Sequence, residues 1–303
     1  MAHASDSVRR ARPLLGTFVE IVVSGERPSG LDATFEVAFA TVAKVHELMS
    51  FHESNSDVSK LNREAWERPV VVDAWTYQVL QDALDLHRRS AGLFDITIAP
   101  VLQDMDLLPR ARGQRAPTST RIAMVDAVAL LAGRRVRFLR PGMAIDLGGI
   151  AKGFAVDRAV DALKSRGVSC GLVNAGGDLA AFGTDPQPIH VRDPREPGRC
   201  ICRIDVMDEA VASTGIGFGP FRSANTSASA VIDPRSQRPV IEIAGTTTRA
   251  PSCWIADALT KIVMIEGTGA SPLLDDYDAS ALIVLPNGEV RVTANWKGAA
   301  LAA

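Results

Sequence analysis

The sequence predicts an α+β protein in which helices pack on mixed, largely antiparallel sheets. Three observations indicate this class. Apolar residues recur at helical spacing over residues 34–49, a strand, two glycines and a helix follow one another over residues 145–165, and apolar strands flank Asn287-Gly288, a strong hairpin signal. Because paired strands alternate irregularly with helices, this class is favoured over a doubly wound parallel sheet.

The first half of the chain is predicted to be mainly helical. A helix over Thr34–Met49 carries one apolar stripe, and a second runs from Asp73 to Ser90 and ends at Gly92. Residues 103–120, which are rich in Arg, Pro and Gly, read as a surface loop. Thr118-Ser119-Thr120 then caps a third helix that reaches Leu131.

The second half is predicted to hold most of the strands. Its expected elements are strands at Val136–Leu139 and Met143–Leu147, a helix over Ile150–Ser165, a strand at Gly171–Asn174, loops at residues 185–188 and 193–197, and hairpin strands at Ala281–Leu285 and Glu289–Thr293. We expect one domain over residues 1–303, with room for a smaller subdomain around residues 185–250.

Composition excludes several classes of protein. The chain has 303 residues, 47% of them hydrophobic, and a formal net charge of -2, so it can bury a core and has no basic surplus for nucleic acid. No segment approaches the ~20 apolar residues of a membrane span. The spacing of the four cysteines suits neither a metal site nor a redox motif. Arg9-Arg10 is not followed by the apolar run of an export signal, so we expect a cytoplasmic protein. The alternative is export, if the N-terminus has been trimmed.

The glycine turn at Gly148-Gly149 is the most informative motif. It leads from a strand into a helix whose first turn offers backbone N–H groups, and Lys152 adds a positive charge there. This combination is typical of phosphate sites. The alternatives are a turn with a purely structural role and, for Asp146, a helix cap.

Two further motifs carry polar groups. Asn174-Ala175-Gly176-Gly177-Asp178 is a second glycine turn after an apolar strand, where Asn174 and Asp178 either face a ligand or bond their own backbone. Asp257 and Lys261 are four residues apart on a late apolar helix, where they form either part of a site or a simple ion pair.

Together these segments resemble the ApbE family, the FAD:protein FMN transferases. Four more blocks stand in the family's order. Leu15–Ile21 looks like its opening strand and Ser54–Asn62 like its flavin-side loop, and Phe94–Pro100 and Val231–Arg235 correspond to two more blocks. The resemblance covers most of the chain. It implies an ApbE-like, T-fold-like architecture.

The resemblance also implies an activity. Such enzymes bind FAD and Mg²⁺, a threonine hydroxyl of a flavin-accepting redox protein attacks the FMN phosphorus, and AMP leaves. The residues carried over as contacts to FAD are Gly16, Ser54, Asp57, Asp95, Asp146, Gly148, Gly149, Lys152, Asn174, Gly176, Gly177, Asp178 and Thr214.

The implied metal site departs from the family pattern. Asp257 and the backbone carbonyl of Ala151 match two Mg²⁺ ligands, but Lys261 stands where the family has a hydroxyl. Thr260 is adjacent but points about 100° away on a helix. Either Thr260 or water completes the metal site, or Lys261 supplies a fixed positive charge. Asp257, Lys261 and Asp178 are the predicted catalytic residues.

Two other departures concern proton transfer and leave the function open to alternatives. Ala230 stands where the family commonly has a His. Ile216 stands where an acidic residue is often found, directly after the turn that ends at Thr214-Gly215. Asp178 and Asp233 remain as candidate bases. The alternatives to FMN transfer are an FAD-binding homologue with weak or no transferase activity, and an FAD pyrophosphate hydrolase.

Overall fold

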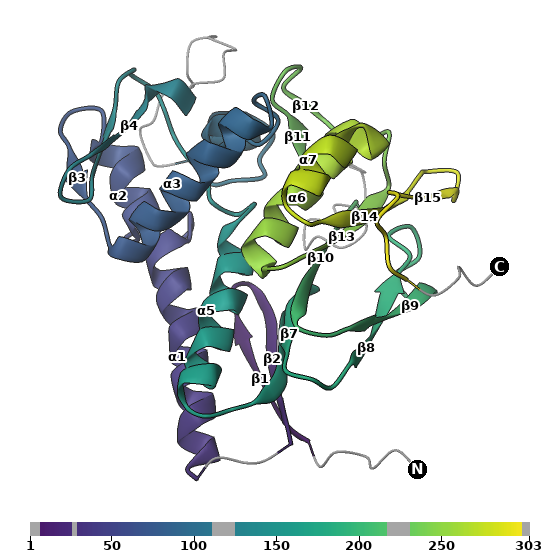
Figure 1. The fold of residues 1–303 in the computed structure, drawn as a ribbon. Coiled ribbons are helices and arrows are strands. Elements are labelled where there is room, and N and C mark those ends of the chain that lie inside the picture. Colours follow the sequence, from purple (N-terminus) through teal and green to yellow (C-terminus); the bar gives the residue numbers. More distant parts are fainter. Residues whose placement is uncertain (1–6, 26–28, 111–124, 217–230, 299–303) are drawn as a thin grey trace, which may run out of the picture. The chain divides into compact units, whose positions relative to one another are not determined.

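The structure is a computed structural model that describes residues 7–25, 29–110, 125–216 and 231–298 (Figure 1). The chain divides into two compact units. The first unit comprises the described parts of residues 1–46, 152–218 and 243–303, and the second unit those of residues 47–151 and 219–242. The single domain and the subdomain around residues 185–250 stay predictions.

The first unit is built on an eight-stranded sheet whose neighbouring strands are all antiparallel, in the order β1-β2-β6-β7-β10-β13-β14-β15. Its strands are β1 (Val8–Leu14), β2 (Thr17–Ser24), β6 (Cys170–Ala175), β7 (Asp178–Phe182), β10 (Glu209–Gly215), β13 (Gly245–Ala250), β14 (Ser280–Val284) and β15 (Val290–Val292). The predicted α+β class with antiparallel strands is confirmed.

Helices cover one face of this sheet. Arg12 of β1 lies opposite Val19, and its guanidinium lies over the ring of Phe39 in α1 (Leu31–Met49), so α1 packs on the face that carries Val19. Asp178 lies opposite Ala175, which pairs with Val19, and it meets a side chain of α5 (Ala151–Ser165) on the same face. α6 (Cys253–Glu266) packs against β7, β10, β13 and β14.

A hairpin of β8 (Gln187–Arg192) and β9 (Cys200–Val206) packs against the other face. Apolar side chains of this hairpin, including Val191 and Ile204, form one cluster with Val22 and Leu172 of the sheet. The sheet is therefore buried on both faces, which explains the nearly continuous burial of β6 and β7.

The C-terminal part continues from α6 through η3 (Gly267–Ala270) and α7 (Ser271–Asp276) into the hairpin of β14 and β15. In the turn between these two strands, the Gly288 N–H donates to the Leu285 carbonyl at 2.9 Å. The φ angle of Gly288 is 94°. The hairpin predicted at Asn287-Gly288 is confirmed.

The second unit is a smaller mixture of helices around a three-stranded sheet of order β3-β5-β4. Its elements are α2 (Asp57–Glu64), β3 (Val70–Val71), α3 (Ala74–Arg89), η1 (Ile96–Ile98), α4 (Ala99–Asp104), η2 (Val125–Ala127), β4 (Val128–Leu131), β5 (Arg135–Phe138), β11 (Ile232–Asp233) and β12 (Arg238–Pro239).

Two predicted elements of the second unit are wrong. The block Ser54–Asn62 is largely helix α2, because the Ser56 side chain accepts the Ser59 N–H at 3.0 Å and so caps a helix of mostly polar residues. The helix predicted to reach Leu131 is also wrong at its end, where Val128–Leu131 pairs with β5 as a strand. The start of that helix and residues 111–120 of the predicted loop lie outside the described residues.

Three boundaries also differ. Residues 143–147 do not form a strand, because the Asn62 side chain bonds both the N–H and the carbonyl of Ile145 in place of a neighbouring strand. The predicted loop at residues 103–120 begins with the end of α4, and the one at residues 185–188 ends in β8. The other predicted helices and strands are confirmed within one to three residues at their ends.

Candidate functional site

The site in the first unit begins where α5 crosses α6 at Gly153. A Cβ added to Gly153 would lie 2.3 Å from the Cys253 carbonyl oxygen and 2.7 Å from the Trp254 Cα. No side chain fits this spacing, so glycine is required for the two backbones to approach. This contact brings the first turn of α5 to α6.

Asp157, one turn further along α5, fixes the start of α6. Its Oδ1 accepts the Cys253 N–H at 2.8 Å and its Oδ2 accepts the Trp254 N–H at 2.9 Å. Burial raises the pKa of Asp157 to about 6, although these two amides favour the charged carboxylate. Asp157 thus caps α6 from a neighbouring helix. The N-cap residue of α6, Ser252, makes no side-chain hydrogen bond to the helix start.

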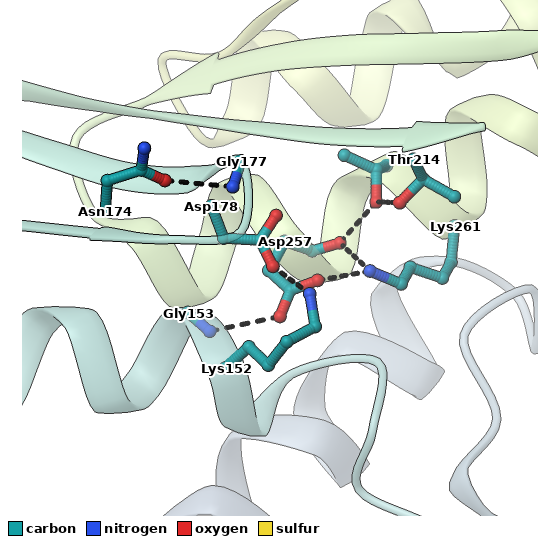
Figure 2. A network of polar contacts seen from close by, with 9 residues as sticks. Lys152, Gly153, Asn174, Gly177, Asp178, Thr214, Asp257 and Lys261 are labelled. Carbon is teal, nitrogen blue, oxygen red and sulfur yellow. Dashed lines mark hydrogen bonds and ion pairs between the residues drawn. The ribbon is translucent and has the colours of Figure 1, made fainter. Parts of the chain in front are cut away.

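Asp257 lies at the centre of the site and is fully buried. Its Oδ2 accepts the Gly153 N–H at 3.1 Å, and its Oδ1 forms an ion pair with Lys261 one turn along α6 (Figure 2). The Lys261 ammonium also donates to the backbone carbonyl of Asp257 at 2.9 Å. The ion pair that the sequence offered as an alternative is therefore present.

A second ion pair joins Lys152 of α5 to Asp178 at the start of β7 (Figure 2). Burial disfavours the charged form of Lys152, but Asp178 and Asp257 outweigh it and raise the pKa of the lysine above its ordinary value. Burial, together with the charge of Asp257, raises the pKa of Asp178, which Lys152 only partly offsets. Two lysines and two aspartates thus form one cluster.

Two threonine hydroxyls complete the network. The Thr260 hydroxyl donates to the Asp257 backbone carbonyl at 2.6 Å and lies 2.8 Å from the Thr214 hydroxyl. Since Thr260 has already used its proton, Thr214 donates to Thr260. Thr260 is fully buried, so this chain of hydrogen bonds ties β10 to α6.

The glycine turn between β6 and β7 has a structural role. The Asn174 side chain accepts the Gly177 N–H at 2.9 Å, as expected if it bonds its own turn. Gly176 and Gly177 have φ values of 68° and 106°, and a Cβ on Gly176 would lie 2.5 Å from the Thr17 hydroxyl. Thr17 follows Gly16, so two hairpin turns lie side by side at this end of the sheet.

The prediction that α5 offers unpaired amides is wrong for three of them. The N–H groups of Ile150 and Ala151 both donate to the Leu147 carbonyl, and that of Gly153 donates to Asp257. Positive charge near this helix start therefore comes from lysine side chains.

The residues around Asp257 do not fit an open Mg²⁺ site. Mg²⁺ needs oxygen lone pairs in octahedral geometry. Here the Lys261 ammonium is paired with one carboxylate oxygen, the Gly153 amide with the other, and the Thr260 hydroxyl lies inside the protein. In the part of the chain that the structure describes, no cluster of three or more His, Cys, Asp or Glu residues suits a metal either. Thr260 as a metal ligand stays a prediction, and its buried hydroxyl is hydrogen-bonded to Thr214 and to the Asp257 carbonyl.

The other predicted FAD contacts lie in the second unit: Ser54, Asp57, Asp95, Asp146, Gly148 and Gly149. Asp57 Oδ2 accepts the Asp73 N–H at 2.7 Å and the Thr76 hydroxyl at 2.9 Å, and Asp95 caps η1 by accepting the N–H and hydroxyl of Thr97. Ser54 is exposed. Their contact with FAD stays a prediction, as does a metal contact for the Ala151 carbonyl.

Sequence reasoning missed Gly153, Asp157 and Cys253. The only local signal was the four-residue spacing of Gly153 and Asp157, which places both on one face of α5. Burial and the nearby aspartates raise the pKa of the Cys253 thiol well above its ordinary value. All four cysteines are free, and of these Cys200 alone is exposed. Ala230 lies outside the described residues.

The chain is similar to known proteins over most of its length. The profile of the ApbE family matches residues 15–283. The chain belongs to the ApbE family. Relatives named FAD:protein FMN transferase include those of Vibrio cholerae, 27% identical over 74% of this chain and 70% of the relative, and Treponema pallidum, 26% identical over 94% and 86%.

Solved ApbE structures share the fold. That of the ApbE protein from Thermotoga maritima has a TM-score of 0.84 at 27% identity and covers 95% of this chain and 97% of its own. The flavin transferase ApbE of Vibrio cholerae has a TM-score of 0.82 at 22% identity, covering 96% and 98%. Among the described helices, none has the length and apolar character that crossing a bilayer requires.

Proposed function

We propose that this ApbE-family chain transfers FMN from FAD to a threonine hydroxyl of a flavin-accepting redox protein and releases AMP. The observation that carries the proposal is the cluster in which Lys152 and Lys261 are held by Asp178 and Asp257 between α5, β7 and α6. Relatives across most of this chain are named for this activity.

The cluster suits the charge that develops in the reaction. The acceptor oxygen attacks the phosphorus of the FMN half of FAD, the bond from that phosphorus to the bridging oxygen breaks, and AMP leaves with that oxygen. Negative charge grows on the phosphoryl oxygens and on the leaving phosphate. Ammonium groups held in place by buried carboxylates stabilise that charge without reorganising during the reaction.

We assign the proton of the acceptor hydroxyl to Asp178. Its pKa is raised by burial and by Asp257, which makes it a stronger base than an exposed aspartate. Asp233 is the weaker candidate, because hydrogen bonds from Arg235 outweigh its partial burial and lower its pKa. Asp257 and Lys261 then act in positioning and in charge stabilisation.

The remaining assignments follow the family resemblance. From the resemblance alone we propose FAD contacts in the first unit at Gly16, Asn174, Gly176, Gly177 and Thr214. For the second unit, taken by itself, the resemblance proposes FAD contacts at Ser54, Asp57, Asp95, Asp146, Gly148 and Gly149. Mg²⁺, which the resemblance also implies, supplies Lewis-acid charge where it binds, but the residues around Asp257 do not fit it and no step above uses it. Four free cysteines support the proposed cytoplasmic location.

The test uses the purified chain, FAD and a redox-complex subunit that natively carries phosphoester-linked FMN, prepared without flavin. We expect intact-protein mass spectrometry to show the FMN adduct on the subunit. Lys164→Thr, which changes a half-exposed lysine of α5, serves as a control that keeps the activity. AMP release without an acceptor would favour the hydrolase, and bound FAD with no product would favour the binding homologue. No adduct, while a known transferase labels the same subunit, would overturn the proposal.

A further inference from the structure

We propose that the ammonium group of Lys261 takes the place of a divalent cation in this chain, so that the site handles the pyrophosphate of FAD without Mg²⁺. The inference rests on the proposed function for its substrate. It concerns the position at which this sequence departs from the hydroxyl expected in the family, and it follows from what the structure places there.

Every oxygen of Asp257 already has a hydrogen-bond partner, and a metal would have to compete with a charged donor there. Lys261 Nζ is paired with Oδ1 and lies 2.9 Å from the backbone carbonyl, while Oδ2 lies 3.1 Å from the Gly153 nitrogen. A metal at Oδ1 would have to displace the ammonium from both oxygens. Because Asp257 is fully buried, the displaced lysine would give up a desolvated ion pair.

Lys261 still has a donor for a ligand. An ammonium has three N–H groups, and the structure directs two of its hydrogen bonds at Asp257. The Lys261 side chain is 19% exposed, whereas that of Asp257 is 0% exposed, so the cation is the part of this pair that reaches the surface. The pair therefore presents positive charge outward.

Charge balance supports the same assignment. Lys152 and Lys261 balance Asp178 and Asp257, so the cluster is formally neutral with lysine at position 261. A hydroxyl residue at that position would leave one negative charge unbalanced. That charge would attract a divalent cation. With the lysine present, Mg²⁺ would add two unbalanced positive charges beside Lys152.

The simpler alternative is that Lys261 is only a structural partner of Asp257. A structural pair contributes to stability but has no reason to change how the protein responds to metal. The two interpretations therefore differ in metal binding and in the metal dependence of the reaction.

The first test measures metal binding with no FAD present. Mn²⁺ alone is titrated into the full chain and free Mn²⁺ is followed by electron paramagnetic resonance. We expect no bound Mn²⁺ at millimolar concentration in the wild type, and one bound ion in Lys261→Thr, which restores a hydroxyl one turn after Asp257. The double variant Asp257→Asn with Lys261→Thr should lose that ion. Lys164→Thr makes the same change at a lysine of another helix, α5, and should bind Mn²⁺ no better than the wild type.

The second test measures FMN transfer to the same flavin-free subunit with EDTA and with added Mg²⁺. We expect wild-type transfer to be equal in both, and Lys261→Thr to be faster with Mg²⁺ by about 100-fold or more, because the charge of a metal ion stabilises such a transition state strongly. Wild-type transfer that stops in EDTA and returns with Mg²⁺, or one Mn²⁺ bound to the wild type at Asp257, would overturn the inference. If Lys261→Thr does not fold, these wild-type measurements still decide. If no variant transfers FMN, the proposed function fails while the Mn²⁺ titration still tests Lys261.

Discussion

Both units bury aspartates, and Asp57 and Asp95 of the second unit differ from Asp178 and Asp257 of the first in what surrounds them. In the second unit, Asp57 and Asp95 are 5% and 8% exposed and accept hydrogen bonds from amides and hydroxyls at helix starts, and the ammonium of Lys60 lies 3.6 Å from Asp57 Oδ1. In the first unit, Asp178 and Asp257 are 1% and 0% exposed and face lysine ammonium groups. Burial alone therefore does not mark a reactive aspartate. The difference lies in the hydrogen bonds: amides and hydroxyls donate to Asp57 and Asp95, whereas lysine ammonium groups donate to Asp178 and Asp257.

The largest expected effect comes from removing a carboxylate that faces a lysine. Asp257→Ala should lower FMN transfer about 10²–10³-fold, because Lys261 loses the anchor that positions its charge. Steady-state kinetics with a flavin-free acceptor measure this. Adding Lys261→Met should recover thermal stability, since it removes the unpaired cation, but not activity. Recovery of activity in the double variant would show that this pair is structural only.

The next effect tests the backbone contact beneath the same pair. Gly153→Ala should lower the free energy of unfolding by about 3 kcal/mol, because its Cβ would lie 2.3 Å from the Cys253 oxygen and α5 must move away from α6. Urea unfolding measures this change. Gly198→Ala is the matched control, since a Cβ there meets nothing within 4 Å and should change stability by less than about 0.5 kcal/mol. Equal effects would contradict the close approach.

The next prediction concerns removal of an aspartate from the second unit, which should mainly lower the stability of the folded protein. Asp57→Ala should cost about 2 kcal/mol, because the Thr76 hydroxyl and the Asp73 amide lose their acceptor. Chemical denaturation gives this value, and FAD affinity is measured on the same folded sample. A loss of affinity larger than the unfolded fraction explains would assign Asp57 a second, ligand-facing role through its other oxygen.

The last effect depends on pH. The pKa of Asp157 is about 6 in the folded protein against an ordinary value of 3.8, so folding favours its protonated form. The stability that this group contributes is complete below about pH 4 and is lost as pH rises to about 6. The destabilisation caused by Asp157→Asn should therefore shrink by up to about 3 kcal/mol as pH rises through about 6, and stay constant above that. Urea unfolding at several pH values tests this, and a pH-independent difference would refute the shifted pKa.

Local patterns predicted much of the fold. Helical spacing predicted α1 and α3, glycines predicted the turns before α5 and after β6, and Asn287-Gly288 predicted the last hairpin. The helix α2 was missed because its eight residues are mostly polar, and only Val58 and Leu61 pack into the core while Ser56 caps its start. The extended segment around Ile145 was misread because Asn62, 83 residues away, supplies the hydrogen bonds that a strand would otherwise need.

The site could be predicted only in part, because some of its contacts join residues that are far apart in the sequence. The spacing of Asp257 and Lys261 on one helix face is local, and their ion pair followed from it. The bond from Gly153 to Asp257 joins residues 104 positions apart, and the Asp157 carboxylate reaches α6 from another helix. Such contacts arise from the packing of α5 on α6, which no periodic pattern in a single sequence encodes.

The distribution of thiols has a practical consequence. Cys170, Cys202 and Cys253 are buried and Cys200 is exposed on β9, while burial and nearby carboxylates keep the Cys253 thiol protonated. Thiolates rather than thiols react with maleimides, so a single fluorophore or surface tether can be attached through Cys200. The native chain thus carries its own labelling position, and flavin exchange can be followed optically without engineering any residue around the lysines.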